Sequence, residues 1–277
     1  MAGGLEYEAQ SSKEWMRQQR PLFMFLIVAY TLFVINAPRF QKGRKCRGLP
    51  TIIFCWNTFN ALADAFLLLG LLPDFVSSFQ NGFYSSLCLN GELYKNSRTG
   101  KALFTFHISK IWELFDTILV ILDGREVDTL HVTHHIAISV LMVYSYQYVG
   151  AMARWIAVTN LAAHFALYSY LAAQSCVWKR RTRSACVISG IQLAQFPICL
   201  LSLLKIRQFL NAKKKCETGY NGPTIIIYAT FFILFIQFYI KKYGRRNSNK
   251  EVLRGNSMNF RLFTELRRKW PSKDNLT

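Results

Sequence analysis

The 277-residue chain lacks the marks of several common protein classes. The segment from Met1 to Arg20 is polar and of mixed charge, and no small-residue cleavage site follows the first apolar run, so we predict no secretory signal. The sequence has no internal repeat and no low-complexity stretch, and nothing in it resembles a nucleic-acid-binding module. Acidic residues are scarce, with 15 Asp and Glu against 34 Lys and Arg. We therefore interpret the positive charge as a sign of membrane topology and of a phosphate-rich ligand.

Long apolar runs, separated by charged segments, dominate what is present. A run of about 20 apolar residues crosses the hydrocarbon core of a bilayer as a helix. The predicted spans are Pro21–Ala37, Ile52–Leu72, Ala102–Leu122, His131–Tyr148, Arg154–Val177, Ala185–Leu204 and Thr224–Ile240. The sequence therefore predicts an all-α integral membrane protein with seven transmembrane helices, made of one spanning domain over residues 1–240 and a basic tail over residues 241–277.

The distribution of Lys and Arg predicts the orientation of the spans. These residues are more frequent in the connections after the first, third and fifth spans and in the tail, taken together, than on the other side. Because the richer side of a membrane protein is usually cytosolic, we expect a lumenal N-terminus and a cytosolic C-terminus. The basic run at Lys213, Lys214 and Lys215 falls on the expected lumenal side and is an exception.

Ionisable residues occur inside the predicted third span, where they are energetically expensive. Lys110, Glu113, Asp116 and Thr117 fall on one face of a continuous helix. Such residues within a membrane usually mark a functional site. A purely structural ion pair between Lys110 and Glu113 is the alternative, but it leaves Asp116 unexplained.

Histidine is rare, with only five in the chain, yet three lie within five residues at the predicted cytosolic start of the fourth span. These are His131, His134 and His135, and His164 lies in the fifth span. Further polar residues recur at helical spacing in the fifth and sixth spans: Asn160, Tyr168, Gln192 and Gln195. At about 1.5 Å of rise per residue, all of these groups fall in the cytosolic half of the bilayer. One polar chamber open to the cytosol explains this, although the two glutamines alone could simply hold helices together.

The order of these motifs resembles that of the very-long-chain fatty acid elongases. The motifs are Lys110-x-x-Glu113-x-x-Asp116-Thr117, His131-x-x-His134-His135, Asn160-x-x-x-His164-x-x-x-Tyr168 and Gln192-x-x-Gln195. The resemblance implies seven helices around a polar chamber and an acyl tunnel, residence in the endoplasmic reticulum membrane, and acyl-CoA and malonyl-CoA as substrates with no further cofactor. The product would be a 3-oxoacyl-CoA two carbons longer, which other enzymes of the elongation cycle would process.

The residue types suit this chemistry. Imidazole is both a nucleophile and a proton carrier near neutral pH, so we expect His134 to form an acyl intermediate, with His131 and His135 orienting it. His164 is expected to stabilise an oxyanion or enolate. A histidine acting only as a general base is the alternative mechanism.

The remaining polar groups have supporting roles in this hypothesis. Asn160, Gln192 and Gln195 would donate hydrogen bonds to the same oxygen, and Tyr168 would contact substrate. Asp116 and Glu113 would fix imidazole tautomers, while Lys110 offsets their charge. A basic cluster at the cytosolic ends of the fifth and sixth spans, formed by Lys179, Arg180, Arg181 and Arg183, could bind the phosphates of CoA or simply anchor the topology.

Three other readings stay open at this point. The His-x-x-His-His pattern also occurs in membrane oxidases and desaturases, but these need more histidines than the five present, and we expect no metal. A seven-span receptor or transporter would more naturally place its polar site on the opposite side. A cysteine nucleophile lacks neighbours that would activate it.

Two cysteines fall in loops that the charge pattern places in the lumen. Cys88 follows the second span and Cys216 precedes the seventh, whereas the other five lie in or beside spans or in the first cytosolic loop. Because the lumen is oxidising, we predict a disulfide between Cys88 and Cys216. The alternative is two free loop thiols.

Overall fold

The computed structural model describes residues 9–40, 48–148, 150–176, 182–217 and 221–244, and throughout these residues the chain is helical with no strand. The α-helices are α1 (Ala9–Phe40), α2 (Leu49–Gln80), α3 (Phe83–Cys88), α4 (Ser97–Trp112), α5 (Phe115–Leu122), α6 (Thr129–Ser145), α7 (Ala153–Cys176), α8 (Thr182–Asn211) and α9 (Asn221–Tyr239). A short 3₁₀ helix, η1 (Tyr146–Tyr148), follows α6, and a π-helix, η2 (Ile240–Gly244), follows α9. The predicted tail lies outside the described residues from 245 onward.

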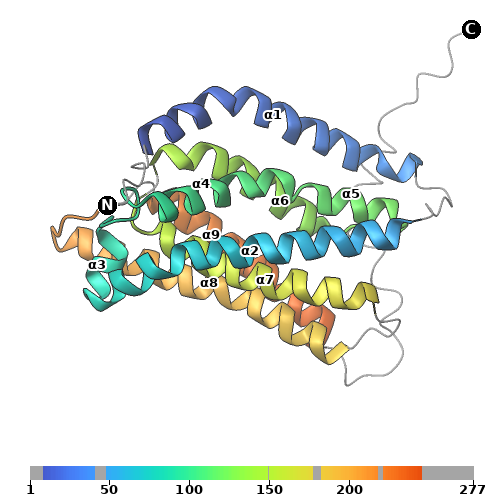
Figure 1. The fold of residues 1–277 in the computed structure, drawn as a ribbon. Coiled ribbons are helices and arrows are strands. Elements are labelled where there is room, and N and C mark those ends of the chain that lie inside the picture. Colours follow the sequence, from blue (N-terminus) through green and yellow to red (C-terminus); the bar gives the residue numbers. More distant parts are fainter. Residues whose placement is uncertain (1–8, 41–47, 149, 177–181, 218–220, 245–277) are drawn as a thin grey trace, which may run out of the picture.

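The long helices run side by side in one bundle, with the short α3 at one end, which we call the α3 end (Figure 1). Helix α1 lies along one flank and packs against α6 and α4, while α2 packs mainly against α7. Helices α8 and α9 pack together, and α8 also contacts α7. The bundle thus surrounds α4, α5, α6 and α7, the helices that carry most of the predicted site.

Five helices are long and apolar enough to cross a membrane: Ala9–Ala37, Leu49–Gln80, Ala153–Ser175, Ser184–Asn211 and Gly222–Tyr243. They correspond to the predicted first, second, fifth, sixth and seventh spans. The chain is therefore a multi-pass membrane protein. Helix α6 has 17 residues, and α4 and α5 have 16 and 8, so none reaches the length of these five.

The predicted third span, Ala102–Leu122, is not one continuous helix, and this expectation was wrong. The regular α-helical hydrogen bonding is interrupted at Glu113 and Leu114, between α4 and α5, although both residues keep right-handed helical backbone dihedrals. Hydrogen bonds between residues three apart replace the usual spacing of four there. They run from the Leu114 amide to the Ile111 carbonyl at 3.3 Å and from the Asp116 amide to the Glu113 carbonyl at 3.0 Å. Irregular backbone is tolerated at membrane depth only where protein or water covers it, and both residues at the break are buried.

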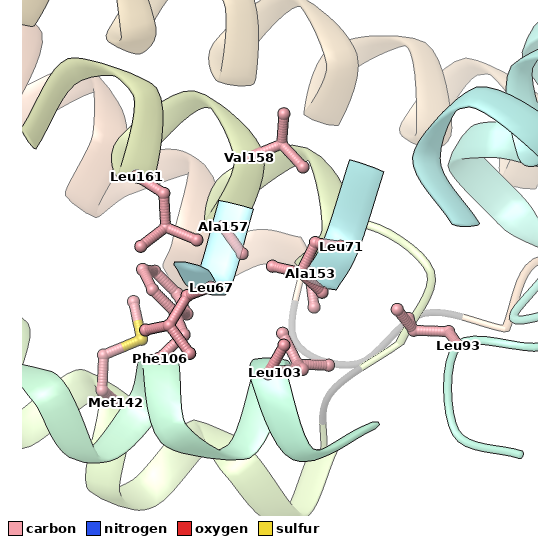
Figure 2. Close-up of a cluster of buried hydrophobic side chains, with 11 residues drawn as sticks. Leu67, Leu71, Leu93, Leu103, Phe106, Met142, Ala153, Ala157, Val158 and Leu161 are labelled. Atoms are coloured by element: carbon pink, nitrogen blue, oxygen red, sulfur yellow. The ribbon is translucent and has the colours of Figure 1, made fainter. Parts of the chain in front are cut away.

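An apolar core ties α2, α4 and α7 together between the α3 end and the polar residues. Leu67 and Leu71 of α2 meet Leu103 and Phe106 of α4 and Leu161 of α7 (Figure 2). Helices α2 and α4 approach each other closely beside this core, since a Cβ atom added to Gly70 of α2 would lie 2.8 Å from the Cβ of Ala102 in α4. Small residues allow such approach in membrane bundles, and here they hold α2 against the helix that carries Lys110.

Buried Arg154 connects α2, α3 and α7 at the α3 end of the bundle. Its side chain is 1% exposed and forms a 2.9 Å salt bridge from Nε to Asp74 Oδ2. Its two terminal nitrogens donate to the carbonyls of Ser86, Leu89 and Asn90 at 3.2, 2.9 and 2.5 Å. One cation therefore satisfies a carboxylate of α2 and the carbonyl groups of α3 and the loop that follows it.

A disulfide joins Cys88 and Cys216 across the same end, the pair that the sequence predicted, with 128 residues of separation and Cα atoms 4.3 Å apart. Backbone bonds flank it, since the Glu217 amide donates to the Cys88 carbonyl at 2.7 Å. The Asn90 amide donates to Glu217 Oε2 at 2.8 Å. The segment after α8 is thereby fastened to α3.

The surface and interior have the polarity expected of a membrane bundle. Large apolar side chains point outward, including Phe25, Phe66 and Leu201, which are 67%, 76% and 67% exposed. Polar and charged side chains are buried instead, including Asp64, His107, Lys110, Glu113, Thr117, His135, His164 and Gln195. This polarity places the chemistry of the molecule inside the bundle.

Candidate active site

The break between α4 and α5 carries the first group of site residues. Lys110 Nζ lies 2.6 Å from Glu113 Oε1, and both side chains are almost fully buried. Ser109 Oγ donates to the same carboxylate oxygen at 3.1 Å. The other oxygen, Oε2, lies 3.6 Å from His164 Nδ1 on α7. Glu113 therefore pairs with the Lys110 ammonium of α4 and lies near the imidazole of α7, whose Nδ1 is buried without a hydrogen-bond partner among the described residues.

Asp116, one turn further along, contacts different partners. Its Oδ1 accepts a hydrogen bond from Trp56 Nε1 of α2 at 2.5 Å, and its Oδ2 accepts one from Tyr168 OH of α7 at 2.6 Å. The expectation that Asp116 fixes an imidazole finds no direct contact among the described residues. Asp116 instead joins α5 to α2 and α7.

Between α5 and the histidines of α6, the chain reverses direction in a tight turn. Gly124 adopts a φ of 72°, which a glycine accepts without strain, and Asp128 caps α6 by accepting from the Leu130 amide at 2.8 Å. His131 therefore returns to α5, where its Nε2 lies 3.1 Å from Thr117 Oγ1.

The three imidazoles of α6 lie close to one another. The rings of His131 and His135 have centroids 4.2 Å apart, as one helical turn predicts, and those of His134 and His135 are 5.8 Å apart. His134 faces α9, with its ring edge-to-face against Phe231 at 5.1 Å and Phe235 at 5.5 Å. His134 is thus set apart from its two neighbours, in an aromatic environment.

Amides from α7 and α8 complete the polar group. Asn160 Nδ2 donates to Gln195 Oε1 at 3.0 Å, and Gln195 Nε2 donates to the Gln192 carbonyl at 2.9 Å. The Oδ1 atom of Asn160 is buried without a hydrogen-bond partner among the described residues. Gln192 takes part through its backbone carbonyl, and its side chain makes no hydrogen bond to this group among the described residues.

A narrow cavity lies among these helices. At its polar part stand Lys110, His134, Asn160 and Gln195. The remaining wall is apolar or aromatic and is formed by Phe106, Ile138, Met142, Ile156, Phe196, Tyr228 and Phe231. An imidazole, a cation and two amides therefore share one cavity with an apolar wall.

Comparison with known proteins decides the family. Residues 15–251 match the profile of the ELO (GNS1/SUR4) family. This chain belongs to that fatty acid elongase family. The resemblance predicted from the motifs is thereby confirmed.

Three relatives illustrate the similarity of the ELO chain to curated proteins. It is 28% identical over 233 residues to long chain fatty acid elongase 2 of Caenorhabditis elegans, covering 82% of this chain and 85% of the relative. It is 25% identical over 239 residues to very long chain fatty acid elongase 6 of Drosophila melanogaster, covering 84% and 76%. The match to very long chain fatty acid elongase 3 of Mus musculus is 25% over 228 residues, covering 79% and 82%.

The predicted phosphate-binding residues of the ELO chain have no described side chains. Lys179, Arg180 and Arg181 lie outside the described residues, and Arg183 lies in α8 but its side chain is not described. Their predicted role therefore stays a prediction.

Several residues outside the ELO motifs belong to this group but were not predicted from the sequence. Asp64 of α2 is 3% exposed, its Oδ2 has no hydrogen-bond partner among the described residues, and it lies within electrostatic reach of Lys110 and Glu113. An ionisable residue in the predicted second span was a usable signal for it. Trp56 and Tyr30 also join the group, through Asp116 and Thr117. Aromatic residues are common in spans, so no pattern distinguishes these two.

Proposed function

We propose that this protein condenses a long-chain acyl-CoA with malonyl-CoA in the endoplasmic reticulum membrane, releasing carbon dioxide, CoA and a 3-oxoacyl-CoA two carbons longer. The observation that carries this proposal is the shared cavity of His134, Lys110, Asn160 and Gln195, which continues along an apolar wall. The polar lining suits a thioester by its hydrogen-bonding groups, and the apolar wall suits an acyl chain by its chemistry.

His134 serves as the nucleophile in the first step. Its ring nitrogen attacks the thioester carbonyl, the C–S bond breaks, and the electron pair leaves with the CoA sulfur. The proton that the imidazole loses goes to that sulfur, so free CoA leaves and a neutral acyl-imidazole remains. The aromatic rings of Phe231 and Phe235 shield this intermediate from water.

Malonyl-CoA reacts in the second step. Its bond to the carboxylate breaks, carbon dioxide leaves, and the electron pair stays on the remaining carbon as an enolate. That carbon attacks the acyl carbonyl, the C–N bond to His134 breaks, and the imidazole takes up a proton from solvent in place of the one that left with CoA. Lys110 stabilises the negative oxygen of the enolate, because its ammonium has three protons and donates one to Glu113.

His164 and the amides support these steps from α7 and α8. His164 stands beside Glu113, within reach of the same group of charges as Lys110. Asn160 and Gln195 hold each other in the cavity wall, where they orient the thioester oxygen. The basic cluster Lys179, Arg180, Arg181 and Arg183 binds the CoA phosphates at the cytosolic mouth.

The spans and orientation extend this proposal. Helix α6 and the broken pair of α4 and α5 complete seven crossings with the five long helices. The α3 end faces the lumen, which agrees with a disulfide there and with a lumenal N-terminus before α1. Residues 1–240 form the spanning domain and 241–277 a cytosolic basic tail. Other enzymes of the cycle must then reduce and dehydrate the 3-oxoacyl product.

Incubation with acyl-CoA alone distinguishes a nucleophilic His134 from one that acts only as a general base. Purified protein incubated without malonyl-CoA should release CoA in an amount comparable to enzyme, and peptide mass spectrometry should locate the acyl group on His134. The His134→Ala variant should release none. No CoA release and no adduct from the wild-type protein would refute the nucleophile and favour a general base.

A further inference from the structure

A hydrogen-bonded chain connects α1 to the histidines through α5. Tyr30 OH of α1 lies 2.7 Å from Thr117 Oγ1, and Thr117 Oγ1 lies 3.1 Å from His131 Nε2. Tyr30 is 5% exposed and Thr117 is 0% exposed, so water does not compete for these bonds. The chain reaches α6 from a helix that carries none of the elongase motifs.

The supply of protons fixes the direction of this chain. Tyr30 and Thr117 each have one hydroxyl proton, and the Tyr30 hydroxyl has no other hydrogen-bond partner among the described residues. If Tyr30 donates to Thr117, the Thr117 proton is free for His131 Nε2, and the proton then left on His131 Nδ1 is not on a buried polar atom that lacks a partner. In the reverse direction the phenol proton would be buried without an acceptor, which is unfavourable.

This direction determines the tautomer of His131. A nitrogen that accepts a hydrogen bond carries no proton in neutral imidazole, so the proton of His131 lies on Nδ1. The ring is also fixed in rotation, and it stands 4.2 Å from the ring of His135, which in turn lies 5.8 Å from that of His134. The fixed orientation of the His131 ring therefore constrains the His135 ring beside it and, through His135, the ring of His134.

We propose that Tyr30 is a positioning residue of the condensation site, which holds His131 as its Nδ1-protonated tautomer through Thr117. This inference rests on the proposed function, because it assigns a role beside His134. It makes α1 part of the catalytic unit as well as an outer helix of the bundle. His131 also differs from His134, since among the described residues a hydroxyl contacts Nε2 of His131 and none contacts His134.

Hydroxyl-deleting variants of similar shape test the proposal. Tyr30→Phe keeps the ring and removes the donor, Thr117→Val keeps the shape and removes the relay, and Thr117→Ser keeps the relay. The control is Tyr144→Phe, because Tyr144 is 46% exposed and lies beside Arg20 on the outside of α6. Each variant is assayed for malonyl-dependent extension and for thermal unfolding.

We expect Tyr30→Phe to lower kcat by about tenfold, the scale on which residues that orient a reactive histidine act, with KM for acyl-CoA and the unfolding temperature unchanged. Thr117→Val should behave alike, and the double variant should be no worse than Thr117→Val alone. Thr117→Ser and Tyr144→Phe should keep wild-type kcat.

Other results overturn the inference. A kcat of Tyr30→Phe within twofold of wild type would do so, as would an additive loss in the double variant. A loss explained by a lower unfolding temperature or a raised KM would show a packing role instead. The proposed function fails separately: if His134→Ala retains turnover, the condensation site is wrong, whereas inactive His134→Ala beside fully active Tyr30→Phe refutes only the role of Tyr30.

Discussion

At the scale of the residue, the polar interior is explained by chemistry better than by stability. A buried ion pair such as Lys110 with Glu113 gains about as much from attraction as it loses by leaving water. Apolar side chains in the same place would hold the helices equally well. The concentration of Lys110, Glu113, Asp116 and His164 in one region therefore indicates a functional requirement.

The buried pair still supports the fold once it has formed, and Glu113→Gln tests this. Removal of the carboxylate leaves the Lys110 ammonium without its nearest counter-charge, so we expect the free energy of unfolding to fall by about 3 kcal/mol. Glu92→Gln is the matched control, because Glu92 pairs with Lys95 at the same spacing but at 4.0 Å on the surface. The control should change stability by less than about 0.5 kcal/mol. Equal small effects in denaturation of the two variants would contradict the prediction.

The sequence identified the ionisable residues of the site apart from Asp64, but it did not identify the aromatic residues Tyr30 and Trp56. The histidines, Lys110 and Glu113 were recognisable because charge inside a span is rare. Tyr30 and Trp56 were not, because their role depends on which helices lie beside α5, a property of tertiary packing that spacing within one helix does not contain.

At the scale of the element, the break between α4 and α5 could not be predicted from local sequence. The run from Lys110 to Leu122 contains neither proline nor glycine, the usual causes of a helix break. The contacts of this run supply the cause, since Glu113 turns to Lys110 and His164 while Asp116 turns to Trp56 and Tyr168.

Helix α7 depends on Arg154 at its start. Arg154→Met should lower the free energy of unfolding by about 3–5 kcal/mol, because Asp74 would be left buried and unpaired. The double variant with Asp74→Leu should recover part of this loss. Arg98→Met is the control, since exposed Arg98 donates only to the Leu69 carbonyl at 3.0 Å. Comparable losses for Arg154→Met and the control, in denaturant titrations, would refute this role.

The disulfide fixes α3 to the segment after α8, and its removal should destabilise the whole bundle. Replacement of both Cys88 and Cys216 by Ser frees a loop of 128 residues in the unfolded chain, for which the entropy model gives about 4–5 kcal/mol. The control is Cys55→Ser, because Cys55 is exposed and free. Unfolding of the double variant at the wild-type temperature would show that the bridge contributes nothing.

At the scale of the whole molecule, the charge pattern, the disulfide and the predicted depth of the site all favour the proposed orientation, with the α3 end in the lumen. Five of the seven predicted spans were supported by the five long helices. The two other predicted spans depend on α4, α5 and α6, which are too short or too polar to be recognised by length and composition alone. Polar residues shorten the apolar run of these helices because they face the site.

Epitope tags at the two ends test the orientation. We expect a C-terminal tag to bind antibody in cells whose plasma membrane alone is permeabilised, and an N-terminal tag to bind only after the endoplasmic reticulum membrane is also opened. Both results follow from the excess of Lys and Arg in the tail and in the connections on the same side. An N-terminal tag that is accessible from the cytosol would reverse the orientation.

The central claim is that the cavity beside His134 extends acyl chains with carbon from malonyl-CoA. The most direct measurement supplies purified protein in lipid nanodiscs with a series of acyl-CoAs and isotopically labelled malonyl-CoA, and identifies the products by mass spectrometry. The account predicts a 3-oxoacyl-CoA that is two labelled carbons longer from the wild-type protein, and none from His134→Ala with an unchanged unfolding temperature. Labelled product from His134→Ala at a rate near that of wild type would contradict the account.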